Sequence, residues 1–171
     1  MNIKHQQKIA FGMIVLNGDY VLEECLNSVY DFASQILIAE GPVKYWQERG
    51  ITTSTDKTNY ILDNFSDPKN KIKIIHSQYD EKDSQCNAYM ENLNNDIDYI
   101  WNLDCDEIYK QGDLEKIDKL LFDENYTSVG VQSKSFFGGF DHYLTGFEQN
   151  TDNFLRIFKS YPNCKWSTHR P

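Results

Sequence analysis

The chain has 171 residues, of which 40% are hydrophobic and 14% aromatic, so it is long enough for one well-packed domain and too apolar for a disordered protein. Its formal net charge of -9 argues against nucleic acid as a partner, because phosphate backbones are bound through lysine and arginine patches. The apolar run near the N-terminus is too short for a transmembrane segment and lacks the pattern of a secretion signal. We therefore expect a cytoplasmic protein with reduced cysteines.

Apolar runs alternate with helical patterns in the first part of the chain. Residues 9–16 (IAFGMIVL) form a nearly continuous apolar run, which predicts a strand buried on both faces, and residues 21–30 follow with helical spacing. Further strands are predicted at 36–39, 71–76 and 99–103, separated by a helix carrying Tyr60 and Phe65 and by a helix over 83–93. This alternation predicts an α/β fold with a mainly parallel sheet and right-handed crossovers.

The remainder of the chain is predicted to hold a helix around 114–121 and strands near 129–137 and 154–159. Neither an internal repeat nor a linker is visible, so we expect a single domain over residues 1–171. Polar residues end three of the first four strands, namely Asn17, Glu40 and Asp104. Because ligands bind beyond the carboxyl ends of parallel strands, a site is expected at this edge.

The stretch YIWNLDCDEIY, residues 99–109, places Asp104, Asp106 and Glu107 directly after an apolar run. Two carboxylates ~5 Å apart at an effective dielectric of ~20 repel by about 3 kcal/mol, so either solvent screens them or a cation lies between them. If the backbone is still extended there, Asp104 and Asp106 face the same way and Glu107 faces the other. Such a pair of oxygen ligands suits Mg²⁺ or Mn²⁺, although the same pattern also occurs in polar turns.

Several short segments in this order resemble the family 2 glycosyltransferases of the GT-A fold, in the branch with an LDxDE-type metal motif. The segments are IVLNGDYVLEECLNSV, ILIAEG, STDKT, DSQCNAYM, NLDCDE, and FLRIFK followed by a tryptophan and a histidine. The resemblance implies a three-layer α/β/α domain that transfers a sugar from a nucleotide-diphosphate donor, with a UDP-sugar favoured, to a carbohydrate, lipid or protein acceptor with inversion. It also implies Mn²⁺ or Mg²⁺ as the cofactor.

The resemblance also implies roles for particular residues. Asp104 would lie near the ribose or the metal, and Asp106 would coordinate the metal that bridges the diphosphate. Glu40 would hydrogen-bond the base or the ribose, and Asn17 would lie in the nucleotide pocket. His169 resembles a late histidine that reaches the metal or the diphosphate, and a surface or packing role is equally open for it.

The sequence departs from the family pattern in two places. Residues 42–53 intervene between Glu40 and the STDKT segment, and Cys86 stands where the family has an arginine that could face the nucleotide. An inverting transferase also needs a base for the acceptor hydroxyl, and residues 136–150 supply Glu148 and Asp141 as candidates. A solvated loop is an equally open interpretation of that segment.

Two other functions are compatible with the same fold. A nucleotidyl- or phosphotransferase would share the sheet and the acidic pair, but the glycine-rich phosphate loop with a lysine is missing after the first strand. A non-catalytic nucleotide-binding domain of a larger assembly would keep the fold without turnover. Of these functions, the sequence favours the metal-dependent glycosyltransferase.

Overall fold

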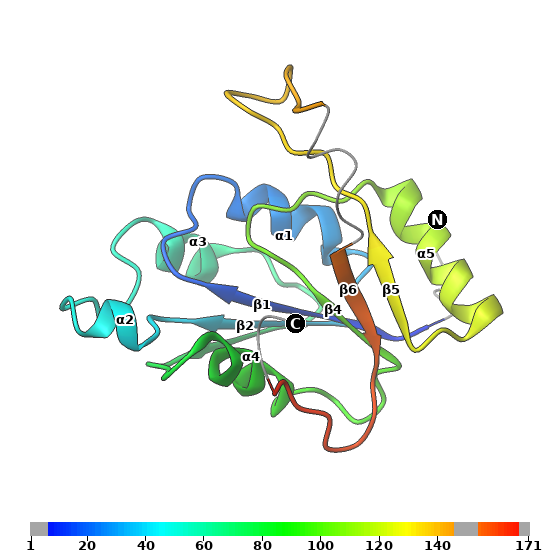
Figure 1. Ribbon diagram of the computed structural model, residues 1–171, viewed down its shortest axis with the longest axis horizontal. Helices are drawn as coiled ribbons and strands as arrows, with labels where there is room; N and C mark the ends of the chain where they lie inside the picture. The colour runs from blue at the N-terminus through cyan, green and yellow to red at the C-terminus, as the bar shows by residue number, and fades with distance from the viewer. Residues whose placement is uncertain (1–6, 146–153, 168–171) are drawn as a thin grey trace.

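The computed structural model describes residues 7–145 and 154–167, which form one mixed sheet with helices packed on both faces (Figure 1). The sheet has six strands in the order β3-β2-β1-β4-β6-β5. Its strands are β1 (Ile9–Val15), β2 (Gln35–Glu40), β3 (Ile72–His76), β4 (Tyr99–Asn102), β5 (Ser128–Val131) and β6 (Phe154–Lys159). The first four run parallel, and β6 is antiparallel to both of its neighbours. The predicted α/β class with a mainly parallel sheet is confirmed.

One strand is shorter in the structure than the sequence predicted. The strand expected near 129–137 ends at Val131 as β5, and the following segment leaves the sheet as a protruding arm (Figure 1). The aromatic residues that suggested a longer strand belong to this arm, where Phe137 is 75% exposed. Their hydrophobicity therefore does not reflect burial in the core.

Three helices cover one face of the sheet and one helix covers the other. The first face carries α1 (Leu22–Tyr30), α3 (Thr58–Asn64) and α5 (Gln111–Glu124), whose apolar stripes pack into one hydrophobic cluster with the sheet. The second face carries α4 (Lys82–Met90). These layers confirm the α/β/α arrangement. The short helix α2 (Lys44–Gln47) lies in the segment that intervenes after β2 and was not predicted.

The central strand β1 explains how both faces are packed. Phe11 stacks on Trp101 of β4 with ring centroids 5.2 Å apart, and both side chains are fully buried. The next residue, Gly12, faces the opposite layer, where a Cβ atom would lie 2.5 Å from the Tyr89 ring. The Tyr89 hydroxyl in turn donates to Asn102 Oδ1 at 2.9 Å. Helix α4 can therefore approach the sheet closely because β1 has a glycine there.

The strand order locates the place where a ligand is expected. The chain builds β1, β2 and β3 outward in one direction and then returns to form β4 on the other side of β1. This reversal opens a crevice beyond the carboxyl ends of β1 and β4, which is where open α/β sheets bind ligands. Asn17 and Asp104 follow those two strand ends. Within the described ranges, no helix combines the length and apolarity that crossing a bilayer requires.

Candidate functional site

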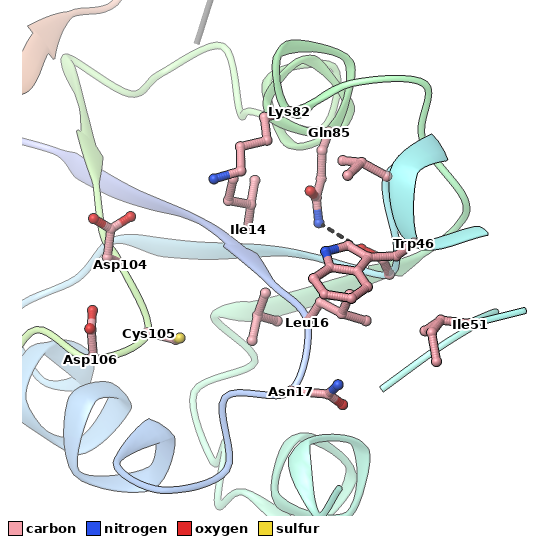
Figure 2. Close-up of a pocket in the computed structure, with 13 residues that line it drawn as sticks. Ile14, Leu16, Asn17, Trp46, Ile51, Lys82, Gln85, Asp104, Cys105 and Asp106 are labelled. Carbon is pink, nitrogen blue, oxygen red and sulfur yellow. Dashed lines mark hydrogen bonds between the residues drawn. The ribbon is translucent and has the colours of Figure 1, made fainter. Parts of the chain in front are cut away.

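A cavity of about 600 Å³ opens at the carboxyl edge of the sheet (Figure 2). Its polar lining comes from Asn17 after β1, Asp104 and Asp106 after β4, and Lys82 and Gln85 of α4. The structure thus brings together the polar ends of β1 and β4, as the parallel arrangement predicted. Glu40, which ends β2, is absent from the cavity lining among the described residues, although its neighbour Gly41 contributes to it.

The acidic segment is a turn and not a continuation of the strand. β4 ends at Asn102, and the backbone N–H of Glu107 donates to the Asp104 carbonyl at 3.1 Å. The condition of an extended backbone, on which the predicted facing of the three side chains depended, is therefore not met in this segment. The turn brings Glu107 back beside Asp104, because a four-residue turn reverses the chain direction.

A cation does lie between two of the carboxylates, and it belongs to the protein. Nη2 of Arg156 is 2.5 Å from Asp104 Oδ2 and 2.5 Å from Glu107 Oε1. Arg156 lies on β6, and the pairing of Trp101 with Ile157 places it next to the end of β4. This arginine was missed in the sequence, where FLRIFK indicated only a strand and a family segment. The signal that could have indicated it was a single arginine among the apolar residues of a predicted strand, because a charge in that position needs a partner of opposite charge.

Glu107 is largely buried and is hydrogen-bonded to other protein groups. Its side chain is 18% exposed, and Oε2 accepts a hydrogen bond from the Tyr109 hydroxyl at 2.9 Å. The Tyr109 hydroxyl also accepts a hydrogen bond from the Trp101 indole at 3.2 Å. Burial raises the pKa of Glu107, although the nearby Arg156 charge opposes that shift. Glu107 therefore connects the acidic turn to the core instead of facing the cavity.

Asp106 is the exposed acid of the turn and lines the cavity together with Asp104. Its Oδ2 accepts a hydrogen bond from the Tyr20 hydroxyl at 3.1 Å, and Figure 2 shows both aspartates on the same side of the cavity. Two carboxylates that reach one cavity fit a Mg²⁺ or Mn²⁺ ion that takes its other ligands from substrate phosphates and water. Among the described residues, no cluster of three or more metal-binding side chains occurs. His169, the third predicted ligand, lies outside the described residues.

Asn17 is held in place by the STDKT segment. Its backbone N–H donates to Ser54 Oγ at 3.0 Å, and its Oδ1 accepts from the Thr55 N–H at 2.7 Å. One residue later, the Gly18 N–H donates to the buried Thr58 Oγ1 at 2.8 Å. Asn17 adopts a left-handed backbone conformation with φ 55°, which asparagine tolerates better than most residues. The loop after β1 is thus fixed by side chains 37 to 40 positions away in sequence.

Glu40 makes its hydrogen bonds to protein groups. Its side chain is 1% exposed, and Oε1 accepts from the Ser54 N–H at 2.7 Å while Oε2 lies 3.0 Å from His76 Nδ1. The Thr53 hydroxyl contacts both carboxylate oxygens. Burial raises its pKa, but the hydrogen bonds from His76, Ser54 and Thr53 outweigh that effect and hold the pKa below its usual value. In this structure Glu40 positions the 53–54 backbone, and its predicted contact with a base or ribose stays a prediction.

The two candidates for the catalytic base stay predictions as well. Asp141 lies on the arm that follows β5 and is not among the described residues that line the cavity. In that arm, the Leu144 N–H donates to the Ser135 carbonyl at 2.8 Å, so the backbone folds back on itself. Glu148 lies outside the described residues.

Two further residues line the cavity from outside the predicted polar strand ends. Lys82, in the first turn of α4, extends its amino group into the cavity toward the side of Asp104 (Figure 2). It supplies a cation four positions before Cys86, which replaces the family's arginine. Trp46 comes from the intervening segment 42–53 and lies on the other side of the cavity. Neither belongs to a motif, so only the tertiary structure indicates their position.

This arrangement defines an α/β protein whose acidic turn and lysine share one cavity at the switch point of a parallel sheet, the type of site that binds a nucleotide or another phosphorylated ligand. The model of the glycosyl transferase family 2 matches residues 52–169, which is more than half of the chain. The protein therefore belongs to glycosyl transferase family 2. No curated protein in the comparison matches the chain.

Solved structures support the fold assignment. Residues 1–349 of S. aureus TarS share 16% sequence identity with this chain at a TM-score of 0.55, covering 77% of this chain and 37% of that one. The same TarS fragment in complex with UDP-GlcNAc gives 15% identity and a TM-score of 0.56, covering 77% of this chain and 36% of that one. The chain thus spans little more than a third of these TarS chains. At this identity the likeness shows a shared fold, and the predicted GT-A fold is confirmed.

Proposed function

We propose that the protein transfers a sugar from a nucleotide-diphosphate donor to an acceptor, with a divalent cation held by Asp104 and Asp106. The observation that carries this proposal is the meeting of Asn17, Lys82 and the two aspartates in one cavity at the switch point of a family 2 domain. A UDP-sugar is the donor we favour, because the TarS fragment of similar fold was solved with UDP-GlcNAc.

Different side chains of the cavity would bind different parts of the donor. Lys82 and Asn17 both line the cavity, where Lys82 would face the negative diphosphate and the Asn17 amide, at the end of β1, would face the ribose or base. A bound Mg²⁺ or Mn²⁺ would supply charge neutralisation of the diphosphate leaving group. Arg156 keeps Asp104 from turning away, because its guanidinium binds Oδ2. His169 is retained as a further candidate ligand.

The transfer step requires a base on the acceptor side. A carboxylate, Glu148 or Asp141, would take the proton of the acceptor hydroxyl as its oxygen bonds to the anomeric carbon. The bond from that carbon to the diphosphate breaks in the same step, and the nucleoside diphosphate leaves. Attack opposite to the leaving group inverts the anomeric configuration. The acceptor is a carbohydrate, lipid or protein hydroxyl.

One observation favours a second candidate, a non-catalytic nucleotide-binding domain. Arg156 already pairs with Asp104 and Glu107, so the acidic turn has a counter-ion without any metal. Such a domain would bind nucleotide independently of Mn²⁺ and would not consume a nucleotide sugar. Release of nucleoside diphosphate from the donor in the presence of acceptor distinguishes it from the enzyme.

Thermal unfolding with ligands tests the metal-dependent proposal. The protein is melted with UDP, ADP, GDP and CDP, each with Mn²⁺ and with a chelator. A ligand at about 100 times its dissociation constant adds roughly 2.7 kcal/mol to the unfolding free energy, which corresponds to several degrees. We expect a Mn²⁺-dependent rise with one nucleotide, strongly reduced in Asp106→Ala.

The matched control is Asp123→Ala, which removes an exposed aspartate on α5 away from the cavity. It should keep the full ligand-dependent rise. A nucleotide effect that is equal with Mn²⁺ and with chelator would favour the non-catalytic domain, and no effect from any nucleotide would refute both functions.

A further inference from the structure

The cavity has a charged end and an apolar end. Lys82, Asp104 and Asp106 lie at one end, and Trp46 and Ile51 lie on the opposite side (Figure 2). Val43, from the same segment as Trp46 and Ile51, also lines the cavity. All three apolar residues come from the segment 42–53, which the family pattern does not contain. A ligand that fills this cavity must therefore combine a charged group with an apolar or flat group at some distance from it.

The apolar wall is held rigidly by its backbone. Val43 forms a parallel bridge with Tyr79, and the Lys44 N–H donates to the Asp80 carbonyl at 3.3 Å. The Gln47 side chain binds the carbonyls of Pro42 at 2.9 Å and of Tyr79 at 2.7 Å. These bonds tie the segment to the chain after β3. Trp46 is thus positioned before any ligand binds, which reduces the entropy that binding must overcome.

Trp46 retains a free aromatic surface. The residue is 45% exposed even though it lines the cavity. Tyr45 meets it edge to face with ring centroids 5.0 Å apart, so the contact orients the ring and does not stack on it. Exposed indole faces are stacking surfaces for flat rings, and stacking on an aromatic side chain tolerates any nucleobase.

We propose that Trp46 is the platform on which the nucleobase of the donor stacks, and that segment 42–53 forms the base-binding wall of the cavity. This inference rests on the proposed function, because the charged end must receive the diphosphate for the base to reach Trp46. It assigns the two ends of the cavity to the two ends of the nucleotide. The base end is then supplied by the segment that intervenes between Glu40 and the STDKT segment.

Calorimetric titration with two kinds of probe tests the assignment. The first probe is whichever of UDP, ADP, GDP and CDP binds wild type most tightly, and the second is inorganic pyrophosphate, which has no base; both are measured with Mn²⁺. Trp46→Ala should weaken nucleotide binding by about 10- to 100-fold and leave pyrophosphate binding within about twofold. Trp46→Phe should retain most of the nucleotide affinity because it keeps a flat ring.

Two further variants serve as matched controls. Lys82→Ala should weaken both probes, because it acts at the charged end. Tyr60→Ala removes an exposed aromatic residue of α3 that does not line the cavity, and should change neither affinity by more than about twofold. Melting curves of all four variants establish that they are folded.

The outcomes separate this inference from the proposed function. Unchanged nucleotide affinity in Trp46→Ala, or an equal loss for nucleotide and pyrophosphate, would overturn the role of Trp46 and leave the proposed function in place. Wild type that binds pyrophosphate as tightly as every nucleotide would also refute the base-binding wall. Wild type that binds none of the probes would overturn the proposed function and this inference together.

Discussion

Arg156 Nη2 lies 2.5 Å from Asp104 Oδ2, so the first acid of the turn after β4 is paired with a cation from the adjacent antiparallel strand. The same nitrogen contacts Glu107. Of the three carboxylates in the turn, Asp106 alone is not bound to Arg156 within the part of the chain that the structure describes. The turn therefore presents one neutralised acid and one exposed acid to the cavity, which limits their mutual repulsion before any ligand binds.

Removal of the Arg156 charge should destabilise the fold. Arg156→Ala leaves the half-buried Glu107 and Asp104 without their shared partner, and loss of one member of such a pair costs about 2–4 kcal/mol. Chemical denaturation at pH 7 measures the loss. Arg156→Lys should lose less, because it keeps the charge but not the planar guanidinium.

Lys116→Ala is the matched control for that loss of charge. Lys116 pairs with Asp113 in an exposed i,i+3 contact on α5, so its removal should cost less than about 1 kcal/mol. Glu107→Gln introduced into Arg156→Ala should restore part of the stability, since it removes one of the two unpaired charges. Equal losses for Arg156→Ala and Lys116→Ala would contradict a structural role for the arginine.

Glu40 predicts a pH dependence of stability. Its pKa in the folded protein is below the ordinary value of 4.5, so the unfolded chain takes up the proton first as the pH falls. Its contribution to stability is fully present above pH 4.5 and is lost as the pH falls through the lower folded value. Glu40→Gln should lose about 1–3 kcal/mol at pH 7, because an NH₂ group replaces an oxygen that accepts hydrogen bonds.

The difference between wild type and Glu40→Gln should narrow as denaturation is repeated from pH 7 toward pH 3. Glu91→Gln removes an exposed glutamate after α4 and should follow wild type at every pH. A difference that stays constant over this range would mean that the charge of Glu40 is not what its hydrogen-bond donors stabilise.

Because the Tyr89 ring lies directly against Gly12, we expect β1 to tolerate no side chain at this position. A Cβ at Gly12 would lie 2.5 Å from the buried ring, so Gly12→Ala should cost about 1–3 kcal/mol in denaturation experiments. Gly112→Ala is the control, because that position in α5 has free space around it and should be neutral or gain up to about 1 kcal/mol.

A double-mutant cycle checks the cause of the Gly12 effect. Tyr89→Val removes the ring, so adding Gly12→Ala to it should cost much less than the same substitution costs in wild type. Additive losses would place the strain elsewhere.

Much of the fold follows from local sequence. The apolar runs at 9–16 and 36–39 became β1 and β2 because strands buried on both faces need nearly continuous apolar residues. Alternation with helical patterns predicted the parallel arrangement. It also predicted that Asn17 and Asp104 would meet at one edge, and the cavity lining confirms that meeting.

Other features depended on contacts between distant parts of the chain. Arg156 meets Asp104 across 52 positions because β6 pairs with β4, and nothing in either local sequence specifies that pairing. Trp46 reaches the cavity because its segment is bonded to the residues after β3. The periodicity of side chains thus determined which elements form and which ends carry polar groups. Only strand pairing in three dimensions decided which charges neutralise one another and which aromatic ring lines the cavity.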